Sequence, residues 1–402
     1  MSESRSEARN VRTQPAFVFH GTRTQLTTNA AAAAAAAPAA TALDAVTAAA
    51  PASAAEAVRH FSERRATARH CIFLAQQCYC VTIQPEPSAE RTHDMPSQQH
   101  PIPSGFGAQA SAHEVIGDLR LDDKLAIVTG GYSGIGVETT RVLVAAGAHV
   151  IVPARDFAKA ESAVGALANV TIEPMDLSNP STIAAFAARH VDTPLHLLVN
   201  NAGLMAAPLS RDARGLESQL ATNHVGHFDL FCQLLPALRR AEGARVIALS
   251  SRGHVRSAFD FNDPNFLHRR YDKMVAYGQS KTANILFAVE ADRRYAADGI
   301  RAYALHPGAI LDTDLARHYD PAELELVIER ARRIGSFKTV EQGAATTIFC
   351  ATSPMLADIG GVYCENCDIA AIKSDGDDGV RPYAIDPEAA QRLWTWTERA
   401  IA

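Results

Sequence analysis

Two short strings decide the fold and chemistry of this chain: TGGYSGIG at Thr129–Gly136 and YGQSK at Tyr277–Lys281. The first follows an apolar run, Leu125–Val128, and precedes a helical pattern over residues 137–146. A glycine-rich turn between a strand and a helix lets backbone amides approach a pyrophosphate, whose charge the helix N-terminus favours. The second string places a tyrosine and a lysine four residues apart on one helix face. Together they predict dinucleotide-dependent hydride transfer, although either string alone is weak.

Composition excludes several other classes of protein. The chain has 402 residues and a formal net charge of −6, whereas a nucleic-acid-binding surface is usually basic, so we expect no nucleic-acid partner. No run of about 18 strongly apolar residues occurs, which predicts no membrane span. The seven cysteines are scattered and do not resemble a disulfide framework. We therefore expect a cytoplasmic protein with reduced thiols, and leave open whether it forms a homo-oligomer.

The first part of the chain differs in composition from the rest. Residues 1–94 lack the apolar periodicity of packed elements and include an alanine tract, Ala30–Ala37. Three interpretations stay open: a spurious extension of a frame that starts at Met95, a disordered tail, or a targeting peptide. Whichever of these holds, we expect residues 95–117 to form a short arm and residues 118–402 to form one dinucleotide-binding domain.

From Lys124 onward, strand-like runs alternate with helical patterns, which predicts an α/β fold: a single Rossmann-type, doubly wound parallel sheet. The expected strands cover residues 125–129, 149–152, 170–173, 195–200, 245–250, 301–306 and 361–364. The expected helices cover residues 135–146, 157–167, 182–190, 219–240, 276–297 and 341–351.

The cofactor residues follow from where the strands end. Gly130, Gly134 and Gly136 provide the tight turn, and Ser133 and Ile135 would lie against the phosphates and ribose. After the third strand, Asp176 and Leu177 would meet the adenine edge, although the aspartate could equally cap the next helix. In NNAG at Asn200–Gly203, the Asn201 amide would hold neighbouring backbone and Gly203 would let the cofactor pass.

The second strand ends with Ala154, Arg155 and Asp156, which bears on the choice of cofactor. An NAD site usually has an acidic residue there for the adenosine ribose, whereas a 2′-phosphate favours an arginine. With Ala154 at the acidic position, Arg155 predicts NADP rather than NAD. A shift of one residue, to Asp156, would reverse this prediction.

Four side chains carry the catalytic hypothesis: Asn223, Ser251, Tyr277 and Lys281. Tyr277 would be the general acid in reduction and the general base in oxidation. A phenol titrates near about pH 10, so it needs a nearby cation, which Lys281 would supply while bonding the nicotinamide ribose. Ser251 would hydrogen-bond the reacting oxygen, and Asn223 would anchor a water chain beyond the lysine.

In these strings, together with NHVGHF (223–228), LSSRGH (249–254) and HPG (306–308), the chain resembles the short-chain dehydrogenase/reductase superfamily from Asp118 onward. NDPNF (262–266) and the sequence around YGQSK are similar to its retinol-dehydrogenase and WW-domain-oxidoreductase branch. The resemblance implies the roles proposed for Asn223, Ser251, Tyr277 and Lys281, and a sheet of about seven parallel strands. Its partner would be a small-molecule alcohol, ketone or aldehyde.

Two segments depart from simple members of the family. Residues 252–276 form a longer stretch that would shape the substrate entrance. After Gly308, the family usually places a threonine where this chain has Asp312, so Thr313, one position later, is the candidate for contact with the nicotinamide. Residues 309–337, the flap segment, would be mobile and cover a hydrophobic substrate.

Other interpretations are weaker. The histidines show no metal-ligand spacing, so we expect no metal. Cys364 and Cys367 have redox spacing but lie beside the last strand, which favours a structural role. The competing functional class is a cofactor-sensing binding protein without turnover, although such a protein would be expected to lose Ser251, Tyr277 or Lys281.

Overall fold

The computed structural model describes residues 98–311, 313–333 and 337–402, so the three interpretations of residues 1–94 lie outside the described residues. Within the described ranges the strands form one sheet of eight, in the order β3-β2-β1-β4-β5-β6-β7-β8. Its first seven strands are parallel, and β8 pairs antiparallel with β7. Their bounds are β1 Leu125–Val128, β2 His149–Ala154, β3 Val170–Pro174, β4 Leu197–Asn200, β5 Ala244–Leu249, β6 Ile300–His306, β7 Val362–Glu365 and β8 Asp368–Ile369. The predicted α/β fold is confirmed.

Strand β1 lies at the point where the order of the sheet reverses. It pairs with β2 on one side and with β4 on the other, with Ala126 opposite Val150 and Leu197. In open α/β sheets, ligands bind outside the carboxyl ends of the strands at such a switch point. The turn that follows Val128 is therefore in the position expected of a cofactor site.

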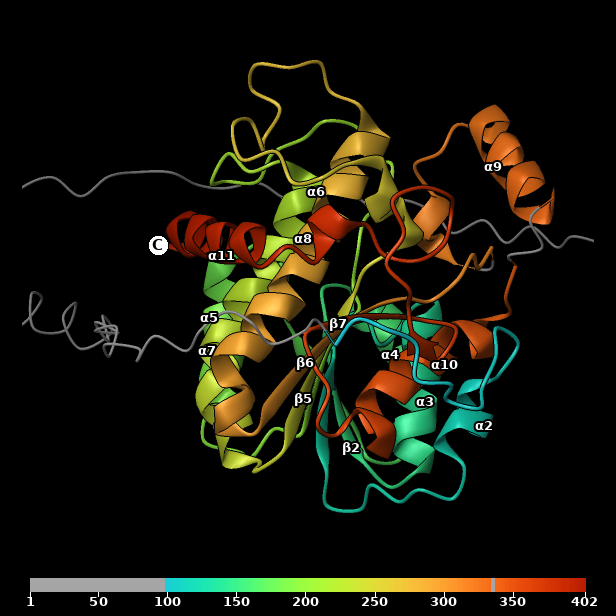
Figure 1. Ribbon diagram of the computed structural model, residues 1–402. Coiled ribbons are helices and arrows are strands. Elements are labelled where there is room, and N and C mark those ends of the chain that lie inside the picture. Colours follow the sequence, from blue (N-terminus) through green and yellow to red (C-terminus); the bar gives the residue numbers. More distant parts are fainter. Residues whose placement is uncertain (1–97, 312, 334–336) are drawn as a thin grey trace, which may run out of the picture. The chain divides into compact units, whose positions relative to one another are not determined.

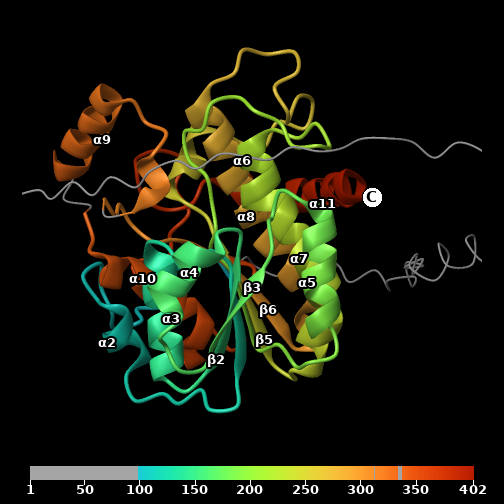
Figure 2. The ribbon, with the colours of Figure 1, turned by 180° about the vertical axis from the view of Figure 1, so that it is seen from behind.

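Helices cover both faces of the sheet (Figures 1 and 2). One layer holds α5 Pro180–His190, α7 Gly226–Arg240, α8 Lys273–Tyr295 and α11 Pro387–Ile401. The other holds α2 Ala112–Ile116, α3 Ile135–Ala145, α4 Phe157–Val164 and α10 Val340–Thr352. The remaining helical elements are α6 Ser218–Leu220, the π-helix η1 Ala221–Val225, α9 Pro321–Arg333 and the 3₁₀ turns η2 Arg252–Arg256, η3 Ala296–Asp298, η4 Asp314–Ala316, η5 Pro354–Leu356 and η6 Pro382–Ala384.

Alternation along the strands divides the hydrophobic core between these two layers. Ile127 and Leu198 contribute to the cluster that includes Phe228 of α7 and Trp394 of α11. Their neighbours Val128 and Val199 contribute to the cluster on the opposite face, with Val142 of α3 and Ile348 of α10 as partners. Because successive strand side chains point to opposite faces, buried runs such as LAIV supply both cores at once.

Residues 98–117 pack against the body of the domain at β7 and β8. The Gln99 side chain is 5% exposed, donates to the Tyr363 and Ala370 carbonyls at 2.8 and 2.6 Å, and accepts from the Tyr363 amide at 2.8 Å. The Ile102 amide donates to Asp368, and Phe106 meets the Phe349 ring edge-on. The segment expected to be a polar arm thus extends the hydrogen bonding at this end of the sheet.

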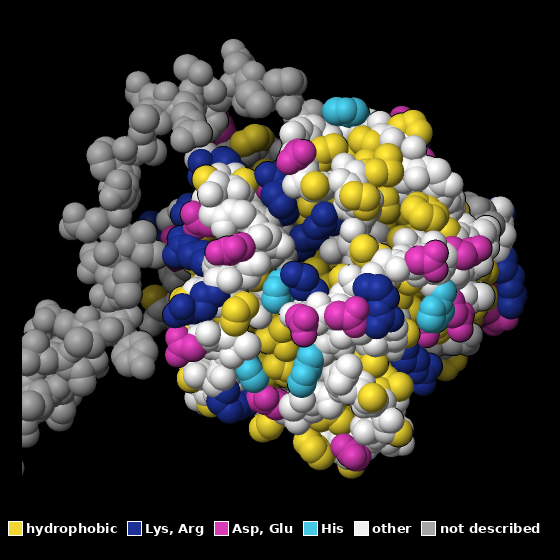
Figure 3. Space-filling model, turned by 90° about the horizontal axis from the view of Figure 1, so that it is seen from below, with side chains coloured by type: hydrophobic (Ala, Val, Ile, Leu, Met, Phe, Trp, Pro, Cys, Tyr) yellow, Lys and Arg dark blue, Asp and Glu magenta, His cyan; other side chains and the backbone are white. Residues whose placement is uncertain are grey.

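At the amino ends of the strands, positive and negative side chains are interspersed (Figure 3). None of the helices in the described ranges has the length and apolarity needed to cross a bilayer.

Three buried histidines tie separate elements together. His224 bonds Thr397 of α11, and His227 bridges the Thr129 hydroxyl and the Asn223 carbonyl. His254 lies between the Ser251 carbonyl and the Arg381 amide. Burial lowers the pKa of His224 to about 3, and those of His227 and His254 to about 4. All three imidazoles are therefore neutral in the folded protein near neutral pH.

These histidines predict a loss of stability in mild acid. In the unfolded chain their pKa returns to about 6.5, so below that pH the unfolded chain binds protons that the folded chain does not. The free energy of unfolding should fall by up to about 1.4 kcal/mol per pH unit for each histidine between pH 6.5 and the folded pKa. Urea unfolding at several pH values should show this dependence of the unfolding free energy on pH. The slope should be smaller in His227→Gln by the contribution of that one histidine, and it should be unchanged in the exposed control His100→Gln. Equal slopes in all three proteins would contradict the assignment.

Candidate functional site

A cavity of about 370 Å³ opens at the carboxyl ends of the strands. Its walls come from the turn after β1, the ends of β2, β3 and β4, and residues 307–317. The predicted cofactor residues that line it are Gly130, Ser133, Gly134, Ile135, Arg155, Asp176, Leu177, Asn201, Gly203 and Thr313. Gly136 lies behind the wall. Tyr277 and Lys281 are buried and do not themselves line the cavity.

The glycine-rich turn is built from positions that tolerate no side chain. Gly130 and Gly134 have positive φ angles of 63° and 53°. A Cβ atom at Gly136 would lie 2.2 Å from the Gly130 carbonyl oxygen and 2.6 Å from Asn201 Nδ2. Helix α3 begins at Ile135, which lines the cavity, so the N-terminus of the helix lies at the cavity wall. The turn has the geometry that a pyrophosphate requires.

Thr129 links this turn to the end of β4. Its hydroxyl accepts hydrogen bonds from the Asn201 and Ala202 amides at 2.9 and 3.0 Å, and Asn201 Nδ2 donates to the Thr129 carbonyl at 2.8 Å. The Asn201 side chain thus holds backbone, as expected from NNAG. Gly203, two residues on, is left at the cavity wall.

Two basic side chains follow the end of β2 at the cavity wall. Arg155 and Lys159 both line the cavity and are exposed. Asp156 is the N-cap of α4 and accepts from the Lys159 amide at 3.0 Å, so its carboxylate serves the helix. Asp176 is not a helix cap: it accepts from the amide and hydroxyl of Ser178, and Asn179 caps α5.

Ser251 and Tyr277 are brought together by two glycines. Ser251 follows β5 and caps η2, its hydroxyl accepting from the Gly253 amide at 3.0 Å. A Cβ atom at Gly253 would lie 2.7 Å from Tyr277 Cε1, and one at Gly278 would lie 2.7 Å from the Gly253 carbonyl oxygen. Because neither glycine has a side chain, α8 lies directly on η2 and the tyrosine ring reaches the serine.

Lys281 lies one helical turn beyond Tyr277 and is 4% exposed. Its Nζ donates to the Leu249 carbonyl at 2.8 Å and lies 5.7 Å from the centroid of the tyrosine ring. A Cβ atom at Gly203 would stand 3.6 Å from this nitrogen and 3.3 Å from Asn223 Oδ1. The lysine, Asn223 and the cavity wall therefore converge at Gly203.

Asn223 lies in the π-helix η1, a form that often marks functional sites. Its Oδ1 accepts from the Leu204 amide at 2.7 Å, and its Nδ2 donates to the Leu204 carbonyl and the Ser280 hydroxyl, both at 2.9 Å. These contacts position the backbone next to Gly203. The water chain expected at Asn223 stays a prediction.

Burial shapes the protonation of this cluster. It raises the pKa of Tyr277 to about 12, opposed by the hydrogen bond with Ser251, and lowers the pKa of Lys281 to about 7. The expectation that the lysine brings the phenol toward neutral pH stays a prediction. Desolvation disfavours the charged forms of both groups.

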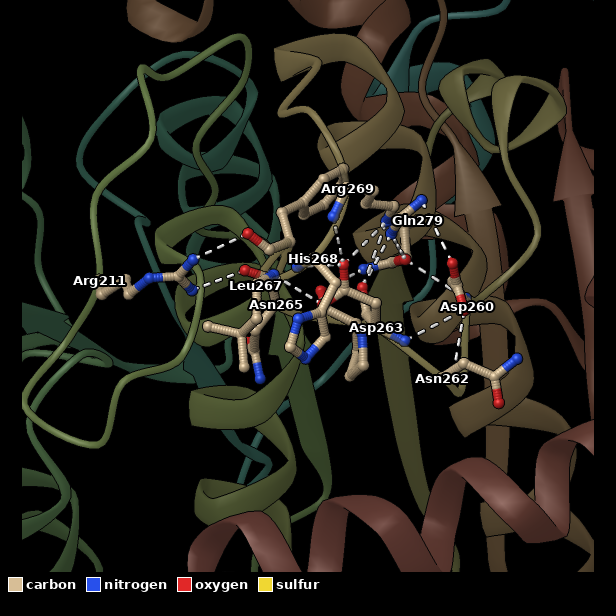
Figure 4. Close-up of polar contacts among 11 residues, drawn as sticks. Arg211, Asp260, Asn262, Asp263, Asn265, Leu267, His268, Arg269 and Gln279 are labelled. Atoms are coloured by element: carbon tan, nitrogen blue, oxygen red, sulfur yellow. Dashed lines mark hydrogen bonds and ion pairs between the residues drawn. The ribbon is translucent and has the colours of Figure 1, made fainter.

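The stretch between Ser251 and Tyr277 packs Phe259 into a buried apolar cluster and is also held by a network of polar contacts (Figure 4). The Asp263 carboxylate accepts from the Leu267, His268 and Arg269 amides, and these bonds lower its pKa despite desolvation. Gln279 stands between Tyr277 and Lys281 in the sequence and is fully buried. Its side chain donates to the Pro264 carbonyl and accepts from Arg269. The predicted entrance segment is thus anchored to α8.

The flap segment is joined at its base and touches the site. Ala309 and Phe337 form a parallel bridge, and Thr313 lies on the glycine-rich turn, its Cγ2 3.0 Å from where a Gly134 Cβ would be. Tyr319 contacts Met274 of α8, and Glu323 pairs with Lys273. Leu326 and Val327 of α9 are 67% and 41% exposed. Asp312, the alternative to Thr313, lies outside the described residues.

Sequence reasoning missed several residues of the cavity. Lys159 and Asp314 form an ion pair across it, and Arg317 also lines it. Only Lys159 gave a signal, because it lies in the first turn of the expected helix that follows Arg155. Gly253 and Gly278 stand in the quoted strings, but their role depends on a tertiary contact.

The remaining candidates contribute nothing to the site. Cys364 and Cys367 are buried free thiols, and burial helps to raise the pKa of each. Among the described residues, no three histidine, cysteine or acidic side chains are grouped as metal ligands would be.

Comparison with known proteins agrees with this geometry. Residues 124–324 match the short chain dehydrogenase family. The chain is 45% identical over 298 residues to a probable oxidoreductase of Streptomyces antibioticus, covering 70% of this chain and 99% of that protein. It is 35% identical to mouse (Mus musculus) retinol dehydrogenase 12, over 69% of this chain and 86% of the relative. It is also 35% identical to the WW domain-containing oxidoreductase of Danio rerio, over 74% of this chain and 73% of that protein.

A solved structure titled as the Pseudomonas aeruginosa RhlG/NADP active-site complex superposes with a TM-score of 0.50 at 28% identity, covering 61% of this chain and 94% of that one. The family match, the relatives and the arrangement of strands, turn and cavity agree. The chain belongs to the short-chain dehydrogenase/reductase family, in the branch of retinol dehydrogenase 12 and the WW domain-containing oxidoreductase.

Proposed function

We propose that this oxidoreductase uses NADP to interconvert an alcohol and a ketone or aldehyde, with Tyr277 as the acid/base. One observation carries the proposal: Ser251, Tyr277 and Lys281 converge beside a cavity lined by the predicted cofactor residues. When bound, the reduced nicotinamide would supply a hydride to the carbonyl carbon. A silent binding protein would not need this cluster. The cytoplasm is the compartment we propose.

In the reduction, Tyr277 gives its phenolic proton to the carbonyl oxygen as that oxygen gains negative charge. The Ser251 hydroxyl donates to the same oxygen and stabilises the developing charge. Burial raises the pKa of Tyr277 to about 12, so the phenol is protonated, as this step requires. The lysine then offers a proton to restore the tyrosine.

Two further observations support the finer assignments. Arg155 and Lys159 offer cationic partners for a 2′-phosphate, while Asp156 is occupied as a helix cap. Ile310 and Leu315 line the cavity, and α9 exposes Leu326 and Val327, so a hydrophobic substrate fits the flap segment.

Replacing Tyr277 by Phe tests the chemical step. It should lower kcat by about 100-fold or more, because proton transfer is lost, and leave NADPH affinity within about threefold. Turnover can be followed by nicotinamide absorbance with a panel of apolar aldehydes and ketones. The control is Tyr295→Phe, on the same helix away from the site. Undiminished turnover in Tyr277→Phe would overturn the mechanism.

Replacing Arg155 by Ala tests the choice of cofactor. The loss of a charge-assisted contact should weaken NADPH binding by about tenfold and NADH binding by less than twofold. Fluorescence titration of both cofactors measures the effect, with the exposed Arg141→Ala of α3 as a control of equal charge. An unchanged ratio of the two affinities would rule out the role of Arg155.

A further inference from the structure

Asp314 joins two parts of the cavity that come from distant parts of the chain. It begins η4 in the flap segment, and its carboxylate pairs with Lys159 of α4. The Ser133 hydroxyl of the glycine-rich turn lies 3.4 Å from the same carboxylate oxygen. A flap carboxylate thus lies between the glycine-rich turn and the cationic end of the cavity.

The charges around the Lys159–Asp314 pair indicate which ligand group would compete with Asp314. Arg155, Lys159 and Arg317 are the basic side chains in the cavity wall, and Asp156 is committed to capping α4. Asp314 is therefore the acidic group that neutralises Lys159, and the pairing lowers its pKa and keeps it ionised. A phosphate at the 2′ position of adenosine needs these same cations. The Asp314 carboxylate and a phosphate would repel each other at this one ammonium, so they compete for it.

We propose that Asp314 competes with the 2′-phosphate of the cofactor for Lys159, and so limits the affinity of the enzyme for NADP relative to NAD. This inference rests on the proposed NADP site. Binding of a phosphorylated cofactor must break the Lys159–Asp314 pair, whereas NAD has no phosphate to take its place. By linkage, NADP weakens the attachment of the flap segment at Asp314 and NAD does not.

The size of the effect follows from the exposure of the pair. The side chains of Lys159 and Asp314 are 46% and 59% exposed, so solvent screens their attraction. Pairs of this kind change an equilibrium by about two- to fivefold. Removing the aspartate should strengthen binding of the phosphorylated ligand by that factor, since it frees the lysine and removes a repelling charge.

The experiment measures dissociation constants by calorimetry for wild type, Asp314→Asn, Lys159→Met and the double variant. NADP⁺ and NAD⁺ are compared, together with adenosine 2′,5′-bisphosphate and 5′-AMP, which lack the nicotinamide and report on the adenosine end alone. Asp314→Asn should bind NADP⁺ and the bisphosphate two- to fivefold more tightly and leave NAD⁺ and 5′-AMP unchanged. In the Lys159→Met background the same change should have less effect. Glu325→Gln, an exposed carboxylate of α9, controls for net charge.

The outcomes separate this inference from the proposed function. If wild type binds NADP⁺ and Asp314→Asn leaves its affinity unchanged, competition at Lys159 is wrong and the NADP site stands. Weaker binding in Asp314→Asn would also overturn the inference, because the aspartate would then clamp the cofactor. If wild type binds neither dinucleotide, the proposed function fails and the inference fails with it.

Discussion

Contacts that exclude a Cβ atom constrain both halves of the site. At Gly136, the backbone of the turn and the Asn201 amide leave no room for a side chain, which fixes the start of α3 over the end of β1. At Gly253 and Gly278, η2 and α8 approach so closely that the Tyr277 ring lies beside Ser251. Any larger residue would have to push backbone apart, since protein interiors are close-packed. The close approach of backbone segments thus sets the shape of the glycine-rich turn and the positions of Tyr277 and Ser251, the proposed acid/base and its partner.

Burial then sets the electrostatic state of the cluster. Tyr277 and Lys281 are nearly inaccessible, and each loses the solvation that would favour its charged form. The tyrosine holds its proton and the lysine readily gives one up, which suits the delivery of a proton to a carbonyl oxygen. Asn223 and His227 support this arrangement, because they bond the backbone of Leu204 and the hydroxyl of Thr129. Much of the polar chemistry therefore serves to hold backbone in place.

Local patterns in the sequence were sufficient for the fold and for most of the cavity wall. The runs at 125–128 and 244–249 are apolar enough to be buried on both faces, and the glycine spacing at 130–136 identifies the turn. Other features depend on contacts between distant segments. The Lys159–Asp314 pair joins residues 155 positions apart, and the interruption of the long helical pattern by a π-helix at Asn223 leaves no local signature. The burial that raises the pKa of Tyr277 likewise depends on tertiary packing, because η2 covers the ring.

The central claim is that hydride and proton are delivered to one carbonyl at Tyr277 and Ser251. The most direct measurement is the transfer of deuterium from C4-deuterated NADPH, followed by mass spectrometry of the product alcohol across a panel of hydrophobic aldehydes and ketones. The account predicts one deuterium on the carbinol carbon with the wild-type protein, and almost none with a Ser251→Ala, Tyr277→Phe variant. Alcohol formed without the label, or label transferred equally well by the double variant, would contradict it.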